Sequence, residues 1–372
     1  MYDTIIIGAG MSGLAAGIRL AYYDRPVCIL ERHSSIGGLT SFYRLRRRDY
    51  DVGLHAVTNY APKGARTGPL ARLLKQLRFR WEEFALAPQV GSEIAFPKTR
   101  LHFSNNPEML ESEIAREFPH EIDNYRKLLG EIVDYDRLDQ RTYSLSAREI
   151  VGQTIRDPLL VEMLFCPLMW YGNARERDMD FGQFSIMFRS IFLEGFARPL
   201  EGVRLILRKL VRKFRGLGGE LKLRSGVSRI TTDGDRAVGV VLDSGEEIRA
   251  KQILSSAGWF ETMRLCDKAA EIAPARAGQL SFIESVSTLD CDPREIGHDR
   301  TIVFYNDSEK FHWERPADDL CDVRTGVVCS PNNFLYDDGQ SLPEGVVRLT
   351  AIAHHDRWAA LEPEAYQTEK AR

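Results

Sequence analysis

The first thirty residues alternate between short apolar runs and one glycine-rich turn. Residues 4–7 (Thr-Ile-Ile-Ile) are β-branched, which is typical of a strand buried on both faces. Residues 14–22 are rich in Ala and Leu and predict a helix, and residues 26–30 predict a second strand that ends at Glu31. The order strand, glycine turn, helix, strand and acid predicts a parallel dinucleotide-binding unit.

A second set of regular elements comes much later in the chain. Residues 202–214 predict an amphipathic helix that ends at the glycines of residues 216–219. Strand-like runs follow, with turn residues at Asp233-Gly234 and Ser244-Gly245, and they occupy residues 220–223, 226–231, 237–242, 247–250 and 252–258. We interpret these runs as a β-meander and a final buried strand that complete the dinucleotide-binding domain.

The rest of the chain has a different pattern. Apolar residues cluster between residues 164 and 196, and the spacing of Phe181, Phe184 and Phe188 places them on one helical face. This face is either core packing, or the wall of a lipophilic tunnel, or a surface that enters a membrane. Strand-like runs at residues 301–305 and 346–350 predict a mixed sheet.

These patterns predict an α/β protein with a discontinuous Rossmann-like domain and an inserted α+β domain. We expect the Rossmann-like domain at residues 1–64 and 196–264. The inserted domain, which we expect to bind the substrate, covers residues 65–195 and 265–372.

Composition narrows the possible partners. The 372 residues carry 50 Lys and Arg against 53 Asp and Glu, and we interpret the two signs as mixed throughout the chain, which gives no reason to expect nucleic acid. No run of 18 apolar residues and no signal peptide is present, so we expect a cytoplasmic protein, with peripheral membrane contact left open. The six cysteines form no CxxC pair, and no His, Cys and carboxylate set has metal-binding spacing.

The glycine turn has a physical reason at each position. Gly8 permits a tight turn out of the strand, Gly10 lets the backbone approach a pyrophosphate, and Gly13 lets the helix pack closely on the sheet. Ser12 lies in the same turn, where the helix N-terminus offers free N–H groups to phosphate oxygens. Glu31 is placed to accept hydrogen bonds from ribose hydroxyls and would repel a 2′-phosphate, which argues against NADP.

Two further motifs resemble one family. Gly37-Gly38 follows Glu31, and residues 50–55 (Tyr-Asp-Val-Gly-Leu-His) contain the pattern D-x-G-x-H. With these motifs the chain resembles the flavoprotein superfamily of amine oxidases, phytoene desaturases and carotenoid isomerases, and the D-x-G-x-H pattern is similar to that of carotenoid isomerase and retinol saturase relatives.

The resemblance implies FAD as the cofactor. It places the Gly37-Gly38 loop against the diphosphate, although Leu39 stands where the family often has Arg or Lys. It places the D-x-G-x-H segment beside the flavin ring, which makes His55 a candidate catalytic residue or a structural hydrogen-bonding neighbour. The full set of candidate FAD-binding residues is Gly8, Gly10, Ser12, Gly13, Glu31, Arg32, Gly37, Gly38, Leu39, Thr40, Gly53, His55, Val227 and Ala257.

Three other features bear on the resemblance. No second G-x-G-x-x-G occurs, which disfavours a reductase with a second NAD(P)H domain. The basic run of residues 44–48 is either a solvated hairpin tip or a contact with a membrane surface. The family's C-terminal Gly-Asp-type motif has no match after Gly345, so we expect the chain to lack the last part of a complete enzyme.

The function expected from this resemblance is FAD-dependent oxidation or reduction of a lipophilic polyene or isoprenoid. Desaturation, saturation and isomerisation, with hydride transfer at flavin N5, fit the same scaffold. A flavin amine oxidase and a non-catalytic FAD-binding fragment are the alternatives. The sequence does not predict an oligomeric state.

Overall fold

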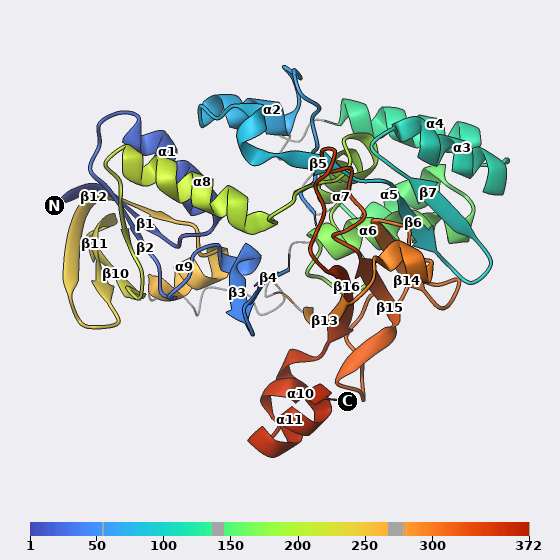
Figure 1. Ribbon diagram of the computed structural model, residues 1–372. Helices are drawn as coiled ribbons and strands as arrows, with labels where there is room; N and C mark the ends of the chain where they lie inside the picture. Colours follow the sequence, from blue (N-terminus) through green and yellow to red (C-terminus); the bar gives the residue numbers. More distant parts are fainter. Residues whose placement is uncertain (54–55, 136–144, 267–277, 279, 372) are drawn as a thin grey trace. The chain divides into compact units, whose positions relative to one another are not determined.

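The computed structural model describes residues 1–53, 56–135, 145–266, 278 and 280–371. The chain forms two compact units, which are coloured by sequence in Figure 1. The first unit contains residues 1–55, 61–86 and 199–277, and the second contains residues 56–60, 87–198 and 278–372. Two of the crossings between the units fall at the short strands β5 (Leu86–Pro88) and β8 (Ala197–Pro199).

The first unit is built on a six-stranded sheet in the order β10-β11-β12-β1-β2-β9. Strands β1 (Tyr2–Ile7), β2 (Val27–Leu30) and β9 (Glu220–Lys222) are parallel. Strands β10 (Val227–Asp233) and β11 (Arg236–Leu242) form an antiparallel meander with β12 (Glu247–Ser255). The two runs expected at residues 247–250 and 252–258 are one strand, because β12 pairs antiparallel with β11 and then parallel with β1.

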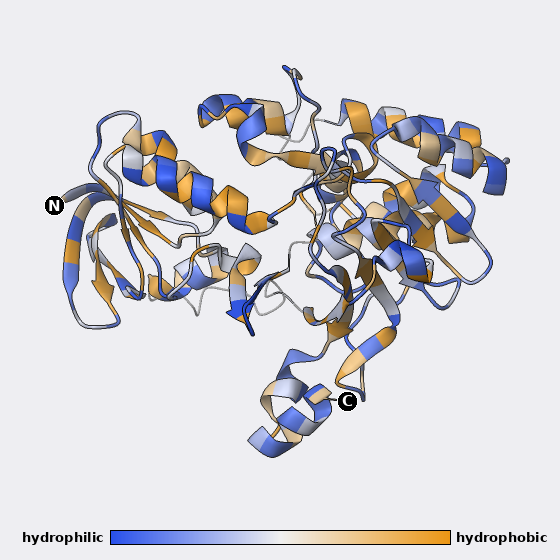
Figure 2. Cartoon of the chain, viewed as in Figure 1, coloured by the Kyte–Doolittle hydropathy of each residue, from blue (hydrophilic) through white to orange (hydrophobic). Residues whose placement is uncertain are grey.

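Helices α1 (Met11–Ala21) and α8 (Val203–Gly216) lie side by side in this unit (Figure 1). Figure 2 shows hydrophobic and hydrophilic residues alternating along α8, as expected for an amphipathic helix. Its apolar residues Ile206, Leu207, Leu210 and Phe214 are buried. The smaller elements of the unit are η1 (Gly38–Thr40), β3 (Phe42–Leu45), β4 (Arg48–Asp51), α2 (Pro69–Gln76), η2 (Trp81–Phe84) and α9 (Trp259–Leu265).

We expected the first domain boundary near residue 65, but residues 61–86 belong to the first unit. The reason is a set of hydrogen bonds around the end of α2. Tyr22 Oη donates to Leu77 O at 2.9 Å, and Arg19 donates to Gln76 O at 2.9 Å. Lys213 Nζ also donates to Leu77 O, at 3.1 Å, so α2 is tied to both α1 and α8.

The second unit is built on a mixed six-stranded sheet in the order β13-β16-β15-β14-β6-β7. Only β14 and β6 pair in parallel among these neighbours. The strands are β6 (Ser92–Ala95), β7 (Arg100–Phe103), β13 (Ser281–Leu289), β14 (Ile302–Asn306), β15 (Cys321–Cys329) and β16 (Gly345–Ala353). The helices are α3 (Pro107–Glu117), α4 (Ile122–Asp134), α5 (Ala147–Thr154), α6 (Pro158–Gly172), α7 (Phe181–Phe188), the π-helical turn Arg189–Leu193, the 3-10 turn Pro293–Ile296, α10 (His355–Ala359) and α11 (Pro363–Ala371).

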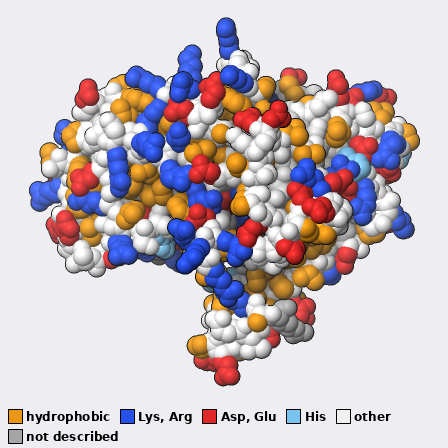
Figure 3. Space-filling model, in the orientation of Figure 1, with side chains coloured by type: hydrophobic (Ala, Val, Ile, Leu, Met, Phe, Trp, Pro, Cys, Tyr) orange, Lys and Arg blue, Asp and Glu red, His pale blue; other side chains and the backbone are white. Residues whose placement is uncertain are grey.

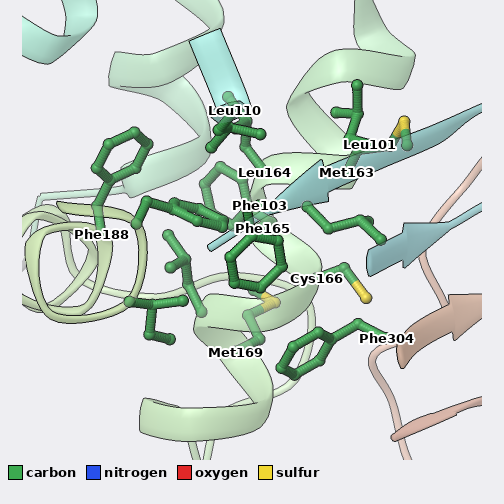
Figure 4. Close-up of a cluster of buried hydrophobic side chains, with 14 of the residues drawn as sticks. Leu101, Phe103, Leu110, Met163, Leu164, Phe165, Cys166, Met169, Phe188 and Phe304 are labelled. Atoms are coloured by element: carbon green, nitrogen blue, oxygen red, sulfur yellow. The ribbon is translucent and has the colours of Figure 1, made fainter. Parts of the chain in front are cut away.

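The apolar zone of residues 164–196 forms the core of the second unit. Phe165, Phe184 and Phe188 are fully buried, and the ring centroids of Phe165 and Phe184 are 4.8 Å apart. Figure 4 shows side chains of α6 and α7 packed with Phe103 of β7 and Phe304 of β14. Among the readings left open by the sequence, these contacts favour core packing for this helical face.

The two units carry opposite charges, which corrects the expectation that acids and bases are mixed throughout. The first unit has 28 Lys and Arg against 17 Asp and Glu, a formal charge of +11. The second has 22 against 36, a formal charge of −14. The total of −3 therefore hides a strongly basic unit and a strongly acidic one.

The core role of α7 predicts a large difference between two substitutions on this helix. Phe184→Ala leaves a cavity among buried rings and should lower the free energy of unfolding by about 3–5 kcal/mol. Ile186→Ala, on the same helix, removes a side chain that is 40% exposed and should cost less than about 1.5 kcal/mol. Urea denaturation of both variants measures the difference, and equal losses would contradict the core assignment.

Candidate cofactor-binding site

The turn after β1 brings α1 unusually close to the sheet. A Cβ atom on Gly13 would lie 2.2 Å from Gly8 O and 2.7 Å from Ser256 Oγ, so no larger residue fits there. Gly8 has a φ of +99°, which favours glycine. Ser256 Oγ donates to the carbonyl oxygens of Ile7 (2.9 Å) and Gly8 (3.1 Å) and so fixes the turn from the end of β12.

Gly10 differs from these two glycines because the protein itself does not require it. Its φ of −69° suits any residue, and the nearest atom to a Cβ there would be Gly37 O at 4.0 Å. Gly10 is the N-cap of α1, and as a glycine it has no side chain that could cap this helix end. The missing side chain leaves open space in front of a helix N-terminus, where N–H groups favour an anion. Ser12 is exposed in the first turn of this helix.

Glu31 lies beside the same turn. Its side chain is buried, and Oε2 accepts a hydrogen bond from Ala9 N at 2.8 Å. Oε1 accepts from His33 N at 2.9 Å. The carboxylate therefore shapes the glycine turn, in addition to the ribose contact that the sequence suggests, and each oxygen retains a further lone pair for a ligand hydroxyl.

The second glycine pair joins the first turn. Gly37 N donates to Ala9 O at 3.0 Å, and Gly37 forms an isolated β-bridge with Gly10. A Cβ on Gly38 would lie 3.7 Å from Gly10 Cα. Next in the chain, Thr40 Oγ1 donates to Gly37 O, whereas the Leu39 side chain is 92% exposed. Two motifs that are far apart in the sequence thus form one glycine-lined surface at the N-terminus of α1.

The start of β10 lies next to the segment that follows Glu31. Arg32 donates to Val227 O at 2.9 Å and pairs with Asp243 at 3.4 Å. Ser225 N donates to Glu31 O at 2.8 Å. The structure thus brings Arg32 and Val227 together. It also adds Asp243, which the sequence did not predict because its ion pair with Arg32 depends on the turn between β11 and β12.

The remaining sequence-predicted residues divide into described and undescribed ones. Asp51 is buried and accepts from Val203 N at 3.3 Å and from Arg204 Nη1 at 3.5 Å, so this motif residue holds the start of α8. Gly53 has a φ of +68°, and Ala257 is exposed just after β12. His55 lies outside the described residues.

The second unit adds buried polar groups that the sequence analysis did not identify. Trp170 Nε1 and Tyr171 Oη are buried and have no hydrogen-bond partner among the described residues. Burial raises the pKa of the Tyr171 phenol well above its usual range. The buried Arg348 guanidinium pairs with Glu284 at 2.7 Å across β16 and β13. Within the described part of the chain, no group of three or more His, Cys, Asp and Glu side chains is arranged to hold a metal ion.

Comparison with known proteins extends these observations. Among curated proteins, the chain is 25% identical over 300 residues to the chloroplastic prolycopene isomerase of Daucus carota, an alignment that covers 70% of this chain and 47% of that protein. It is 24% identical over 321 residues to the all-trans-retinol 13,14-reductase of Danio rerio (76% and 52% covered). It is also 24% identical over 297 residues to the lycopene-forming phytoene desaturase of Pantoea ananas (71% and 57% covered). These alignments span about half the length of the relatives.

Solved structures share the fold. An oxidoreductase from Methanosarcina mazei matches with a TM-score of 0.63 and 18% identity, over 99% of this chain and 81% of that one. Putrescine oxidase bound to putrescine matches with a TM-score of 0.61 and 15% identity, over 98% and 78%. These similarities confirm the expected α/β architecture, with a six-stranded sheet in each of the two units.

A family model that matches the sequence shows the family to which the chain belongs. The family model described as flavin containing amine oxidoreductase matches residues 11–258, which is two thirds of the chain. The match covers the start of α1, Glu31, the second glycine pair and the whole β-meander. The chain therefore belongs to the family of flavin-containing amine oxidoreductases.

Proposed function

We propose that the first unit binds FAD and that the chain oxidises or reduces a lipophilic polyene or isoprenoid. The proposal of FAD as the cofactor rests on one observation: Gly10, Gly37 and Glu31 lie together at the open N-terminus of α1. A pyrophosphate fits there because the helix end supplies N–H donors and neither glycine presents a side chain. When bound, FAD supplies a hydride acceptor at N5 of its ring.

The individual contacts that we propose combine the geometry of this unit with the family resemblance. The N-terminus of α1, with Ser12 in its first turn, and the Gly37–Thr40 segment would hold the diphosphate. Glu31 would accept hydrogen bonds from the adenosine ribose, and Val227, fixed through its carbonyl by Arg32, would contact the adenine. Leu39 provides only backbone atoms for such a contact, since its side chain points to solvent. Gly53, Ala257 and His55 remain candidates by resemblance, with His55 as the neighbour of the flavin ring.

The proposed substrate class rests on the relatives. Three enzymes named for carotenoid or retinol chemistry align with most of the chain. The alignments do not distinguish desaturation, saturation and isomerisation, because all three kinds of name occur among them. An amine substrate is the second candidate, since the family model carries that description.

The glycine turn gives a direct test of FAD binding. Gly10→Ala should fold with wild-type stability, because its φ and its surroundings accept a methyl group. The same methyl group would occupy the proposed pyrophosphate position and should weaken FAD binding at least about ten-fold. Gly13→Ala should instead destabilise the protein itself by about 1–3 kcal/mol, because its Cβ overlaps Gly8 O.

Fluorescence titration with FAD and urea denaturation separate these two effects. Wild-type FAD affinity in Gly10→Ala would show that the pyrophosphate binds elsewhere. A large loss of stability in Gly10→Ala would show that the protein, and not the ligand, requires this glycine.

The reaction is tested by anaerobic mixing of the FAD-loaded protein with carotenoids, retinoids and amines. We expect a polyene to change its absorption spectrum, with bleaching of the flavin where the polyene is oxidised, and we expect amines to leave the flavin oxidised. Bleaching by amines alone would overturn the polyene proposal in favour of an amine oxidase. No change with any compound, added to either oxidised or chemically reduced flavin, would favour a non-catalytic FAD-binding chain.

A further inference from the structure

The positive charge of the first unit is concentrated in two segments. Residues 61–86 and 199–216 carry 12 Lys and Arg against three Asp and Glu, so they supply +9 of the formal +11. Helices α2 and α8 lie in these segments. Most of the excess positive charge of the first unit therefore lies on or next to these two helices.

The cations of α8 lie opposite its buried apolar face. Arg208, Arg212 and Arg215 are exposed and recur at three- and four-residue intervals, which places them on one side of the helix. The end of α2 adjoins the last turn of α8, because Lys213 Nζ donates to Leu77 O and lies 3.7 Å from the centre of the Phe79 ring. We define the α2–α8 basic surface as Arg72, Lys75, Lys209, Arg212 and Arg215. Figure 3 shows Lys and Arg side chains gathered over these two helices.

The cations of this surface form no ion pair with any residue that the structure describes. Within the described part of the chain, no carboxylate lies within ion-pairing distance of any of the five. The three nearby acids are already paired: Glu82 with Lys63, Glu83 with Arg80, and Glu201 with Arg208. In the second unit, by contrast, exposed cations such as Arg116 and Arg126 pair with carboxylates. Uncompensated cations on adjoining helices raise the local positive potential and attract a polyanion.

We propose that the α2–α8 basic surface docks the chain on a bilayer that contains anionic phospholipid. The charge is complementary to such a surface, where each nearby Lys or Arg strengthens binding by roughly five-fold. Leu73, between Arg72 and Lys75, is 45% exposed and gives α2 an apolar side chain that can enter the lipid interface. The choice of a bilayer over another polyanion rests on the proposed lipophilic substrate. This surface is distinct from the basic hairpin of residues 44–48, which the sequence analysis had considered for membrane contact.

Two charge-matched variants of the full chain test the proposal. The first combines Arg72→Glu, Arg212→Glu and Arg215→Glu. The control combines Arg229→Glu, Arg236→Glu and Arg249→Glu, at three arginines of the first unit that are likewise exposed and lie on β10, β11 and β12. Cosedimentation is measured with empty vesicles of phosphatidylcholine and with vesicles of equal parts phosphatidylcholine and phosphatidylglycerol.

The wild-type chain should bind the anionic vesicles and not the neutral ones, and salt at about 0.5 M should release it. The first variant should lose more than about 100-fold in partition coefficient, because it removes three cations and adds three anions, whereas the control should stay within a few-fold of wild type. Thermal unfolding checks that both variants fold, and the milder Arg→Gln triple at the same three positions should show a smaller loss in the same direction.

Three outcomes would overturn the proposal. They are failure of the wild-type chain to bind anionic vesicles, equal losses in the two variants, and binding to a short DNA duplex in place of vesicles. Because the vesicles contain no substrate and no turnover is measured, the result is independent of the reaction proposed above.

Discussion

The close approach of α1 to the turn after β1 is the constraint on which the first unit depends. Gly13 must lack a side chain because Gly8 O occupies the space where a Cβ would lie. Ser256 then holds the two carbonyls at this turn from the end of β12. The turn is contiguous in the sequence, but it is completed by Ser256, which lies 248 residues after Gly8 at the end of a strand that pairs in parallel with β1.

Glu31 shows how one residue can serve both the protein and a ligand. A buried carboxylate is costly unless hydrogen bonds compensate for lost water, and here Ala9 N and His33 N supply two of them. These bonds fix the carboxylate beside Gly10 before any ligand arrives. The same arrangement means that loss of Glu31 would disturb the turn as well as a ribose contact. The protein requires Gly13 for folding but does not require Gly10. Substitutions of these two glycines therefore separate ligand binding from folding more clearly than a substitution of Glu31 would.

Local patterns in the sequence were sufficient to predict the strands of the first sheet and helices α1 and α8, because each of these elements carries its own periodicity and turn residues. Helix α8 and the β-meander lie where residues 202–250 predict them. What the sequence could not provide were contacts between distant segments. Ser256 and Asp243 act through tertiary pairing, and α2 joins the first unit through backbone carbonyls that carry no sequence signal. The aromatic face of α7 was ambiguous for the same reason, since a buried core and a lipophilic tunnel have the same helical spacing.

The net charge of the chain said little about possible partners, because electrostatic forces act only over a short range in salt solution. At physiological ionic strength a charge is screened within about 8 Å, so a partner responds to the few side chains that it faces and not to the total. A chain of −3 can therefore present +9 on two segments, provided that the compensating acids are placed elsewhere. Here 36 of the 53 acids belong to the second unit, where some of them, such as Glu113 and Glu111, pair with that unit's own cations. The acids of the second unit thus lower the total charge of the chain, whereas among the described residues of the first unit no carboxylate pairs with the five cations of the α2–α8 basic surface.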